Sequence, residues 1–328
     1  MAQRSLTAGA EAWPIRGVFR ISRDARTEVR TLVCRIAEGE AVGQGECVPY
    51  ARYGESVESV SAAIAEQADA VAGGLGREEL RRRMPAGAAR NAIDCALWDL
   101  EAKLAGRPVH ELAGLPAPQP LVTAFTLSLD DPAAMGEQAA ANRHRPLLKL
   151  KLGGGAADLD RVAAVRAATE ATLIVDANEA WGPDELATMP AELARLGVSL
   201  IEQPLPAGKD QALAGIPHPV AFCADESCHD RSGLEALVGR YDAVNIKLDK
   251  TGGLTEALAL RQAARDAGLK VMVGCMLATS LAMAPAVLVA QGADFVDLDG
   301  PLLLARDRDP GIRFDDSRMM PPPAALWG

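Results

Sequence analysis

Two lysines alternate with leucines in the run Leu147 to Leu152, where Lys149 and Lys151 are separated by one residue. Alternate side chains of a β-strand share a face, so both ammonium groups project to the same side. Buried cations persist only opposite anions, or where a lysine is meant to lose its proton. An exposed edge strand is the plainer alternative. The charges further along the chain favour a buried site.

Charged residues also end the next four apolar runs. Asp176, Glu202, Asp225 and Lys247 follow Lys151 at successive intervals of 25, 26, 23 and 22 residues. A β-strand with its helix takes about 30 residues. These charges are therefore expected at the carboxyl ends of consecutive strands, where barrel enzymes carry their chemistry. Five unrelated charges would end five consecutive strands only by coincidence. Because buried charges are paired or bind metal, a common functional site is the expected explanation.

Asp176, Glu202 and Asp225 would form an all-oxygen triangle for a hard divalent cation. Mg²⁺ takes few protein carboxylates and leaves places for water and substrate oxygens. The sequence predicts one Mg²⁺ per subunit, with Mn²⁺ as the alternative ion. Zinc is not expected, because neither histidine nor cysteine is in the ligand set.

Lysines flank this triangle, Lys149 and Lys151 on one side and Lys247 on the other. A metal-bound carboxylate has an acidified α-proton, whose loss gives an enediolate that the cation and the lysines stabilise. Neighbouring cations, such as Lys149 beside Lys151, are expected to lower the lysine pKa values from about 10.4. If Lys151 removes a proton from one face and Lys247 returns one to the other, the stereocentre inverts. Opposed bases therefore predict an epimerase or racemase.

The composition narrows the classes of partner. A net charge of -10 argues against nucleic acid and anionic membranes as partners. No apolar run is long enough to span a membrane, and the first residues lack the order of a signal peptide, so a cytoplasmic protein is expected. The six scattered cysteines form no zinc or redox motif, and we expect them to be reduced thiols. The oligomeric state stays open, with a homo-oligomer among the alternatives.

The first 115 residues read as an α+β unit, because short alternating runs are followed by helical periodicity. Polar segments at 22–27 and 49–56 are candidate lids. A stretch rich in proline and glycine at 113–120 marks the boundary. Strands are expected at 13–21, 28–36 and 41–47, and helices at 57–72, 77–84 and 88–104.

Beyond this boundary, short apolar runs alternate with amphipathic segments, which indicates a (β/α)₈-type barrel. Strands are expected at 121–129, 147–152, 173–176, 200–202, 220–225, 243–248, 270–274 and 295–299. Helices are expected at 159–169, 183–196, 233–238, 254–267 and 280–290.

Five motifs together resemble the muconate-lactonizing-enzyme subgroup of the enolase superfamily along the whole chain. The resemblance implies a modified barrel, (β/α)₇β, with an N-terminal α+β capping domain. It implies a capping domain at 1–115, a barrel at 116–310 and a C-terminal segment at 311–328 that returns to the capping domain. The motifs are Lys149-x-Lys151, Val175-Asp-Ala-Asn178, Ile201-Glu-Gln-Pro-Leu205, Ala224-Asp-Glu-Ser227 and Val244-Asn-Ile-Lys-Leu-Asp-Lys-Thr-Gly-Gly253.

The motif Asp297-Leu298-Asp299-Gly300-Pro301 puts two more carboxylates on one face of the last strand. Next to three metal-binding carboxylates they require a cation, and a substrate ammonium would serve. The motif resembles that of dipeptide epimerases, where it binds the N-terminal ammonium of the dipeptide. A strand-end aspartate that caps backbone amides is the alternative for one of the two.

The other site residues follow from the same resemblance. In epimerases of the L-Ala-D/L-Glu type an arginine of the 22–27 loop is associated with the glutamate carboxylate, and Arg26 matches it better than Arg23. Thr126 matches a substrate-contacting position, although a strand threonine is more often ordinary packing. Asn178 and Glu226 are expected to orient the ligands or a metal-bound water.

The resemblance implies Mg²⁺-dependent epimerisation of L-Ala-D/L-Glu-type dipeptides at the α-carbon of the C-terminal residue, in bacterial murein peptide recycling. N-acylamino-acid racemase and o-succinylbenzoate synthase use the same lysines and metal, but their substrates carry no ammonium for Asp297 and Asp299. Muconate cycloisomerisation is disfavoured for the same reason. A catalytically inactive ligand-binding barrel is the alternative from another class. Asp249 is a candidate partner of Lys250.

Overall fold

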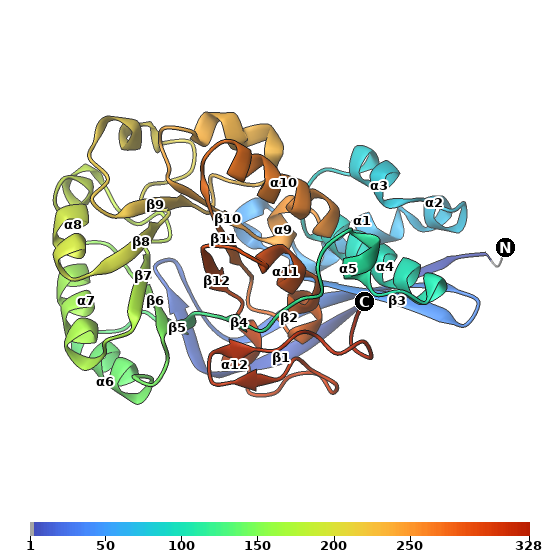
Figure 1. Ribbon diagram of the computed structural model, residues 1–328, viewed down its shortest axis with the longest axis horizontal. Coiled ribbons are helices and arrows are strands. Elements are labelled where there is room, and N and C mark those ends of the chain that lie inside the picture. The colour runs from blue at the N-terminus through green and yellow to red at the C-terminus, as the bar shows by residue number, and fades with distance from the viewer. Residues whose placement is uncertain (1–2) are drawn as a thin grey trace.

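The structure, a computed structural model, describes residues 3–328 (Figure 1). Its N-terminal part is an antiparallel sheet in the order β1-β2-β3, covered by helices. These strands are β1 (Ser5–Ile21), β2 (Asp24–Glu38) and β3 (Ala41–Cys47), followed by η1 (Ala51–Tyr53), α1 (Val57–Ala65), α2 (Ala68–Ala72), α3 (Arg77–Arg83), α4 (Ala88–Ala105) and α5 (Val109–Leu112).

Helix α4 packs directly on β3, and glycine makes this close approach possible. A Cβ atom on Gly43 would lie 2.1 Å from the carbonyl oxygen of Ala96, which is too close for any other residue. The same holds for Gly45, whose added Cβ would lie 2.2 Å from the carbonyl oxygen of Ala92. The sheet and α4 therefore form one packed unit, from which the β1–β2 hairpin extends.

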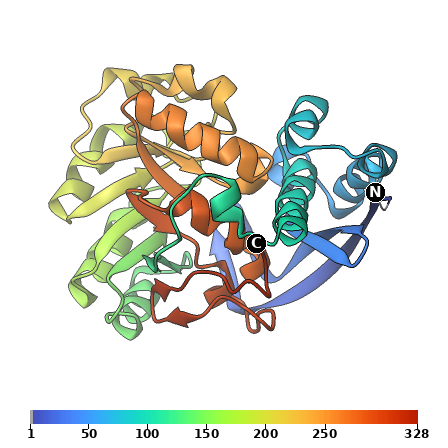
Figure 2. The same ribbon diagram turned by 45° about the vertical axis from the view of Figure 1, so that its right-hand side comes forward.

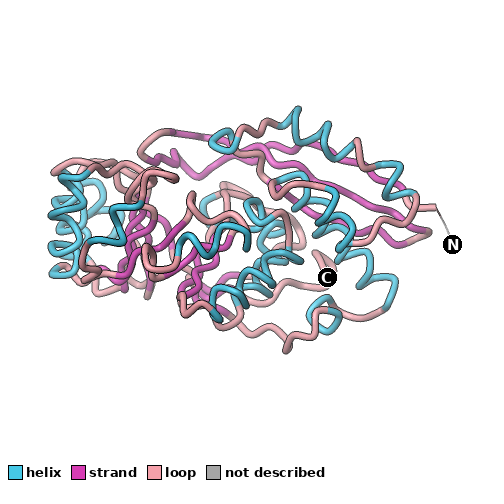
Figure 3. The backbone as a smooth tube through the Cα atoms, turned by 90° about the horizontal axis from the view of Figure 1, so that it is seen from above, coloured by secondary structure: helices cyan, strands magenta, loops and turns pink. Residues whose placement is uncertain are grey.

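The expected polar loop at 22–27 is a β-hairpin instead. The strands β1 and β2 stay paired as far as Ile21 and Asp24, so that only Ser22 and Arg23 form the turn. The prediction was wrong because backbone pairing continues through exposed residues, which carry no hydrophobic alternation. Figure 3 shows this hairpin reaching from the capping sheet toward the barrel.

The rest of the chain forms eight parallel strands in sequence order, with helical segments between them. A hydrogen bond of 2.8 Å from Ala124 N to Val296 O links the two end strands of the sheet. The arrangement confirms the predicted (β/α)₇β barrel. The strands are β5 (Phe125–Leu127), β6 (Leu147–Lys151), β7 (Thr172–Asp176), β8 (Val198–Glu202), β9 (Ala221–Ala224), β10 (Ala243–Ile246), β11 (Lys270–Gly274) and β12 (Phe295–Asp297).

The connections depart from the predicted helices in several places. One helix was missed between β5 and β6, although Asp131 as its cap and Pro132 as its first residue are ordinary start signals. The predicted helix at 233–238 is a 3₁₀ segment. The connections are α6 (Pro132–Ala141), α7 (Ala157–Ala168), α8 (Pro183–Arg195), η2 (Gln211–Gly215), η3 (Arg231–Leu237), α9 (Leu248–Thr251), α10 (Leu254–Asp266) and α11 (Ser280–Ala290), and α12 (Gly300–Leu303) follows β12. The short segments η2, α9 and α12 were not predicted.

The C-terminal segment pairs β13 (Phe314–Asp315) and β14 (Arg318–Met319) with β4 (Leu121–Val122) and then reaches α4 (Figure 2). Trp327 Nε1 donates to the carbonyl of Cys95 at 3.1 Å, and Gly328 N donates to Asp99 Oδ1 at 2.8 Å. The domain limits at 115 and 310 remain a prediction. Within residues 3–328, no helix combines the length and the apolar character needed to cross a membrane.

Candidate active site

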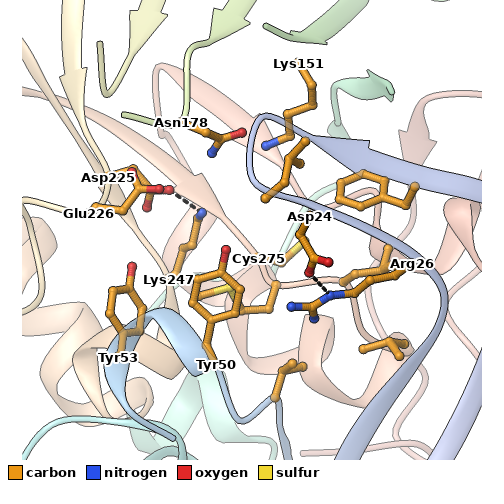
Figure 4. Close-up of a pocket in the computed structure, with 16 residues that line it drawn as sticks. Asp24, Arg26, Tyr50, Tyr53, Lys151, Asn178, Asp225, Glu226, Lys247 and Cys275 are labelled. Carbon is orange, nitrogen blue, oxygen red and sulfur yellow. Dashed lines mark hydrogen bonds and ion pairs between the residues drawn. The ribbon is translucent and has the colours of Figure 1, made fainter. Parts of the chain in front are cut away.

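A pocket lies between the β1–β2 hairpin and the carboxyl ends of the barrel strands (Figure 4). The hairpin contributes apolar residues and one ion pair, the segment after β3 contributes two tyrosines, and the barrel contributes the charged groups. Among the lining residues are Phe19, Ile21, Asp24, Arg26, Tyr50, Tyr53, Lys151, Asn178, Asp225, Glu226, Lys247, Cys275 and Leu277.

Lys151 and Lys247 enter this pocket from different sides, with their ammonium nitrogens pointing into it (Figure 4). Lys151 ends β6 and Lys247 follows β10, and the strands β7, β8 and β9 lie between them in the sheet. Lys151 Nζ is 2.6 Å from Asp176 Oδ2, and Lys247 Nζ is 2.6 Å from Asp225 Oδ2. The two lysines therefore face a common space from opposite sides of the carboxylates.

The three carboxylates end neighbouring strands. Asp176 and Glu202 are register partners on β7 and β8, and Asp225 comes directly after β9. All three side chains are buried. Over residues 3–328, no three histidine, cysteine, aspartate or glutamate side chains converge closely enough to form a ready metal-binding group. Lys149 is interposed instead, with its Nζ 2.6 Å from Glu202 Oε2 and 3.3 Å from Asp176 Oδ2.

The donor set nevertheless fits a divalent cation. Glu202 Oε2 is buried without a hydrogen bond, since its contact with Lys149 lacks hydrogen-bond geometry. Burial, together with the charge of Asp176, raises the pKa of Glu202 to about 7. A cation beside these oxygens would satisfy the free oxygen and stabilise the ionised carboxylates.

For Lys149 and Lys247 the pKa is shifted in the direction opposite to the expected lowering. Burial alone would lower the pKa of Lys247, but the Asp225 and Glu202 carboxylates raise it well above its ordinary value. The pKa of Lys149 is also raised, against the effect of burial, by Asp297 and Glu202. The expectation counted the metal together with the neighbouring lysines, and with the protein groups alone the closer carboxylates dominate.

Asp297 and Asp299 lie at the end of β12, beside a smaller cavity that Lys149, Lys151 and Thr126 also line. Lys149 Nζ donates to Asp297 Oδ2 at 2.8 Å, while Asp297 Oδ1 is buried without a partner. Asp299 Oδ2 accepts from Thr126 N at 2.6 Å, which is the amide-capping contact considered for one of the two. Burial and the neighbouring Asp297 raise the pKa of Asp299 to about 7.

Arg26 lies on β2 at the wall of the larger pocket. Its Nε donates to Asp24 Oδ2 of the same hairpin, and its guanidinium lies 5.9 Å from the ring centre of Tyr50. Figure 4 shows the two terminal nitrogens of Arg26 directed away from Asp24. This edge of the guanidinium is the one that could meet a carboxylate bidentately.

Comparison with known proteins identifies the family. Residues 3–114 match the family described as "Mandelate racemase / muconate lactonizing enzyme, N-terminal domain", and residues 134–324 match "Enolase C-terminal domain-like". The chain belongs to the enolase superfamily. This membership confirms the resemblance on which the predicted fold and site rested.

Two curated relatives of this superfamily cover nearly all of the chain. The L-Ala-D/L-Glu epimerase of Escherichia coli is 48% identical over 95% of this chain and 98% of its own length. An N-acetyl-D-glutamate racemase of Pseudoalteromonas is 45% identical over 90% of this chain and 95% of its own. They confirm the predicted enzyme class, an isomerase.

Solved structures of the superfamily show the same fold. An Agrobacterium tumefaciens enolase family member with homology to dipeptide epimerases, with bound sodium and L-Ala-L-Glu, is 56% identical and covers 99% of this chain and 100% of its own, with a TM-score of 0.97. A dipeptide epimerase from Enterococcus faecalis, complexed with Mg and L-Leu-L-Tyr, is 28% identical, covers 100% of this chain and 99% of its own, and has a TM-score of 0.91.

The candidate site also has an outer set of contacts. Asn178 N donates to Asp176 Oδ1 at 2.9 Å, while Glu226 Oε1 accepts from Arg23 at 2.6 Å. Asn178 Oδ1 and Glu226 Oε2 are buried without partners. Both side chains thus keep an oxygen free, although their predicted orienting role stays a prediction.

Sequence reasoning missed two residues that hold the carboxylates. Lys250 Nζ donates to Asp225 Oδ1 at 2.6 Å, and Asn245 Nδ2 donates to Glu202 at 2.7 Å. Both residues belong to the 244–253 motif. Lys250 comes one strand after Asp225, and Asn245 comes two strands after Glu202, so their place near the same barrel edge was a signal for these contacts.

Asp249 does not pair with Lys250 as expected. Its Oδ1 accepts from Val48 N at 3.0 Å and from Asn91 Nδ2 at 2.9 Å. Burial raises the pKa of Asp249 to about 7. In the short helix α9 the two neighbouring side chains have different partners. Lys250 contacts the barrel, and Asp249 contacts the capping domain.

Proposed function

We propose that this chain catalyses Mg²⁺-dependent epimerisation of L-Ala-D/L-Glu-type dipeptides, by two-base proton transfer at the α-carbon of the C-terminal residue. One observation carries the proposal: Lys151 and Lys247 face one pocket from opposite sides of three buried carboxylates. The names of the Escherichia coli relative and of the Agrobacterium tumefaciens complex support the dipeptide as substrate.

Asp176, Glu202 and Asp225 would hold the metal, one Mg²⁺ per subunit, with Mn²⁺ as an alternative. The bound cation supplies positive charge that acidifies the α-proton of a substrate carboxylate. Lys250 and Asn245 hold Asp225 and Glu202 in place for this task. Asn178 and Glu226 are proposed to orient the ligands or a metal-bound water.

The chain's own lysines move the protons. One of Lys151 and Lys247 takes the α-proton as a neutral amine, and the other, as an ammonium, delivers a proton to the opposite face. A metal cation on Asp225 and Glu202 would favour the neutral amine, because it would oppose the rise that these carboxylates cause in the pKa of Lys247. The roles exchange in the reverse direction, so each epimer needs both lysines. Lys149, fully buried among Glu202, Asp176 and Asp297, supplies fixed positive charge where negative charge develops on the substrate.

Residues at two ends of the site bind the remaining charges of the dipeptide. Asp297 and Asp299 receive the N-terminal ammonium, and the Thr126 amide keeps Asp299 in position. Arg26 receives the side-chain carboxylate of the C-terminal glutamate through its two terminal nitrogens. The substrate ammonium would thereby meet two buried acids, of which Asp297 is otherwise paired with Lys149 and Asp299 with the Thr126 amide.

Racemisation of an N-acylated glutamate is the second candidate, because a relative at 45% identity bears the name N-acetyl-D-glutamate racemase. It would use the same lysines and the same arginine. It leaves Asp297 and Asp299 without a cationic partner from the substrate, and a neutral acyl group against two buried acids is unfavourable.

Purified enzyme with Mg²⁺ should be given L-Ala-L-Glu and N-acetyl-L-glutamate in parallel, and the products separated by chiral chromatography. The proposal predicts conversion of the dipeptide to L-Ala-D-Glu with a much higher kcat/KM than for the acyl amino acid. A higher kcat/KM for N-acetyl-L-glutamate would favour the second candidate instead.

We also propose that the enzyme acts in the cytoplasm, in the recycling of murein peptides. It would do so as a homo-oligomer or as a monomer.

A further inference from the structure

Arg23 occupies the turn of the β1–β2 hairpin and makes contacts that cross from the hairpin to the barrel. Its Nη2 donates to Glu226 Oε1 at 2.6 Å, and its Nη1 donates to the carbonyl oxygen of Asn178 at 2.7 Å. Nη2 also lies 3.3 Å from the hydroxyl of Tyr50, in the segment after β3. One guanidinium therefore joins three separate parts of the chain.

The acceptors for Arg23 come from the segments that directly follow the carboxylate-bearing strands. Asn178 comes two residues after Asp176, and Glu226 comes directly after Asp225. Glu226 is 3% exposed, so the ion pair is shielded from water on the acceptor side. The turn residue before Arg23 adds a bond of its own, from Ser22 Oγ to the same Asn178 carbonyl at 3.3 Å.

Arg26 differs from Arg23 in its polar contacts, although both guanidinium groups lie near Tyr50. Its hydrogen bond and ion pair are with Asp24, on its own hairpin, and its terminal nitrogens stay available on the pocket side. Arg26 alone therefore cannot hold the hairpin against the barrel. The position of its guanidinium over the pocket depends on how firmly the turn three residues earlier is fastened.

We propose that Arg23 is a positioning residue that fastens the β1–β2 hairpin to the barrel and so places Arg26 for the substrate carboxylate. The role of Arg26 in this statement rests on the proposed function, whereas the fastening does not. A guanidinium suits the task because it can donate from two nitrogens to two fixed acceptors at once. A lysine at this position could reach one of the acceptors but would not bridge both.

The fastening is tested first without substrate, by amide hydrogen exchange of the hairpin in Arg23→Gln and in wild type. The proposal expects clearly faster exchange over residues 19–26 and little change in the barrel strands. Arg30→Gln is the matched control, because Arg30 lies on β2, is exposed and forms its ion pair with Glu28 of the same strand. Unchanged exchange in Arg23→Gln would overturn the fastening, whatever the substrate proves to be.

The placement of Arg26 is tested by kinetics with L-Ala-L-Glu. Loss of a charged hydrogen bond that holds the binding group should raise KM roughly tenfold or more and change kcat much less. The preference for L-Ala-L-Glu over L-Ala-L-Gln should fall as well, and Arg23→Lys should recover part of both effects. Faster hairpin exchange with an unchanged KM would overturn the placement of Arg26.

Two further outcomes separate the proposals. If Arg23→Gln does not fold, Glu226→Gln removes the same ion pair from the barrel side, and the same faster exchange of the hairpin is expected in the absence of substrate. If wild type does not turn over L-Ala-L-Glu, the proposed function fails, while the exchange measurement still decides on the fastening.

Discussion

Lys151 and Lys247 lie on opposite sides of the candidate site, each with its ammonium nitrogen 2.6 Å from a different carboxylate. Three strands of the barrel separate them, so a planar intermediate between them would present one face to each lysine. This relationship explains why a single scaffold could remove a proton from one face and return one to the other. It also determines what each lysine variant should do.

Replacement of either lysine should abolish net epimerisation while leaving one half-reaction. In Lys151→Ala or Lys247→Ala, turnover should fall by at least about 10²- to 10⁴-fold, the usual contribution of a positioned acid or base. Each variant should still exchange the α-proton with solvent for one epimer only, because one base remains. Proton NMR in D₂O measures both effects.

Lys270→Ala provides the control, since Lys270 is exposed at the start of β11, at the opposite end of that strand from the site. It should behave as wild type. Full turnover by Lys247→Ala, or exchange of both epimers by one single-lysine variant, would contradict the two-base account.

Asp297 and Asp299 should contribute more to the binding of dipeptides than to the binding of N-acylated amino acids. Asp297→Asn should raise the KM for L-Ala-L-Glu by roughly 10- to 100-fold, because a charge-assisted contact with the ammonium is lost. The KM for N-acetyl-L-glutamate should change little or fall. Initial rates with both substrates measure the difference, and an equal rise in both KM values would argue against an ammonium site.

Metal removal should inactivate the enzyme reversibly. Chelation should abolish activity, and Mg²⁺ should restore it, because the metal neutralises the crowded carboxylates beside Glu202. Mg²⁺ at about 100 times its dissociation constant should also stabilise the fold by about 2.7 kcal/mol. Thermal unfolding with and without Mg²⁺ measures this, and Glu202→Gln should lose most of the stabilisation. Equal Mg²⁺ stabilisation of Glu202→Gln would exclude Glu202 as a ligand.

Asp249 should make folding stability depend on pH. Its pKa of about 7 in the fold lies above the value near 3.9 in the unfolded chain, so between these pH values the folded state binds the extra proton. The stability contributed by the protonated carboxyl is fully present below about pH 4. It is lost as pH rises toward 7.

Asp249→Asn removes this titration. Relative to the variant, wild type should lose up to roughly tenfold in its folding equilibrium constant per pH unit between about pH 4 and 7, and nothing more above that range. Urea unfolding at a series of pH values measures the difference. Parallel pH profiles for the two proteins would show that Asp249 does not titrate in the folded state.

The sequence was sufficient to predict the barrel and the charges at its strand ends. Parallel strands end at one edge, so regular spacing brings Lys151, Asp176 and Glu202 together without any knowledge of packing. The family resemblance then supplied the capping domain and the roles of the last strand.

The contacts between the capping domain and the barrel could not be predicted in the same way. Arg23 meets Glu226 across 203 positions, and Asp249 meets Asn91 across 158, and neither pairing has a local signal. These pairings depend on how the capping sheet and helices pack against the barrel. The same limit applied to the lysine pKa values, which are governed by which carboxylates lie closest.

Two-base proton transfer is tested by proton NMR of the wild-type enzyme in D₂O, with Mg²⁺ and either L-Ala-L-Glu or L-Ala-D-Glu. Two-base transfer predicts loss of the glutamyl α-proton signal from both epimers, together with formation of the opposite epimer carrying deuterium from solvent. Absence of exchange with either epimer, when bound Mg²⁺ has been demonstrated by calorimetry, would contradict it.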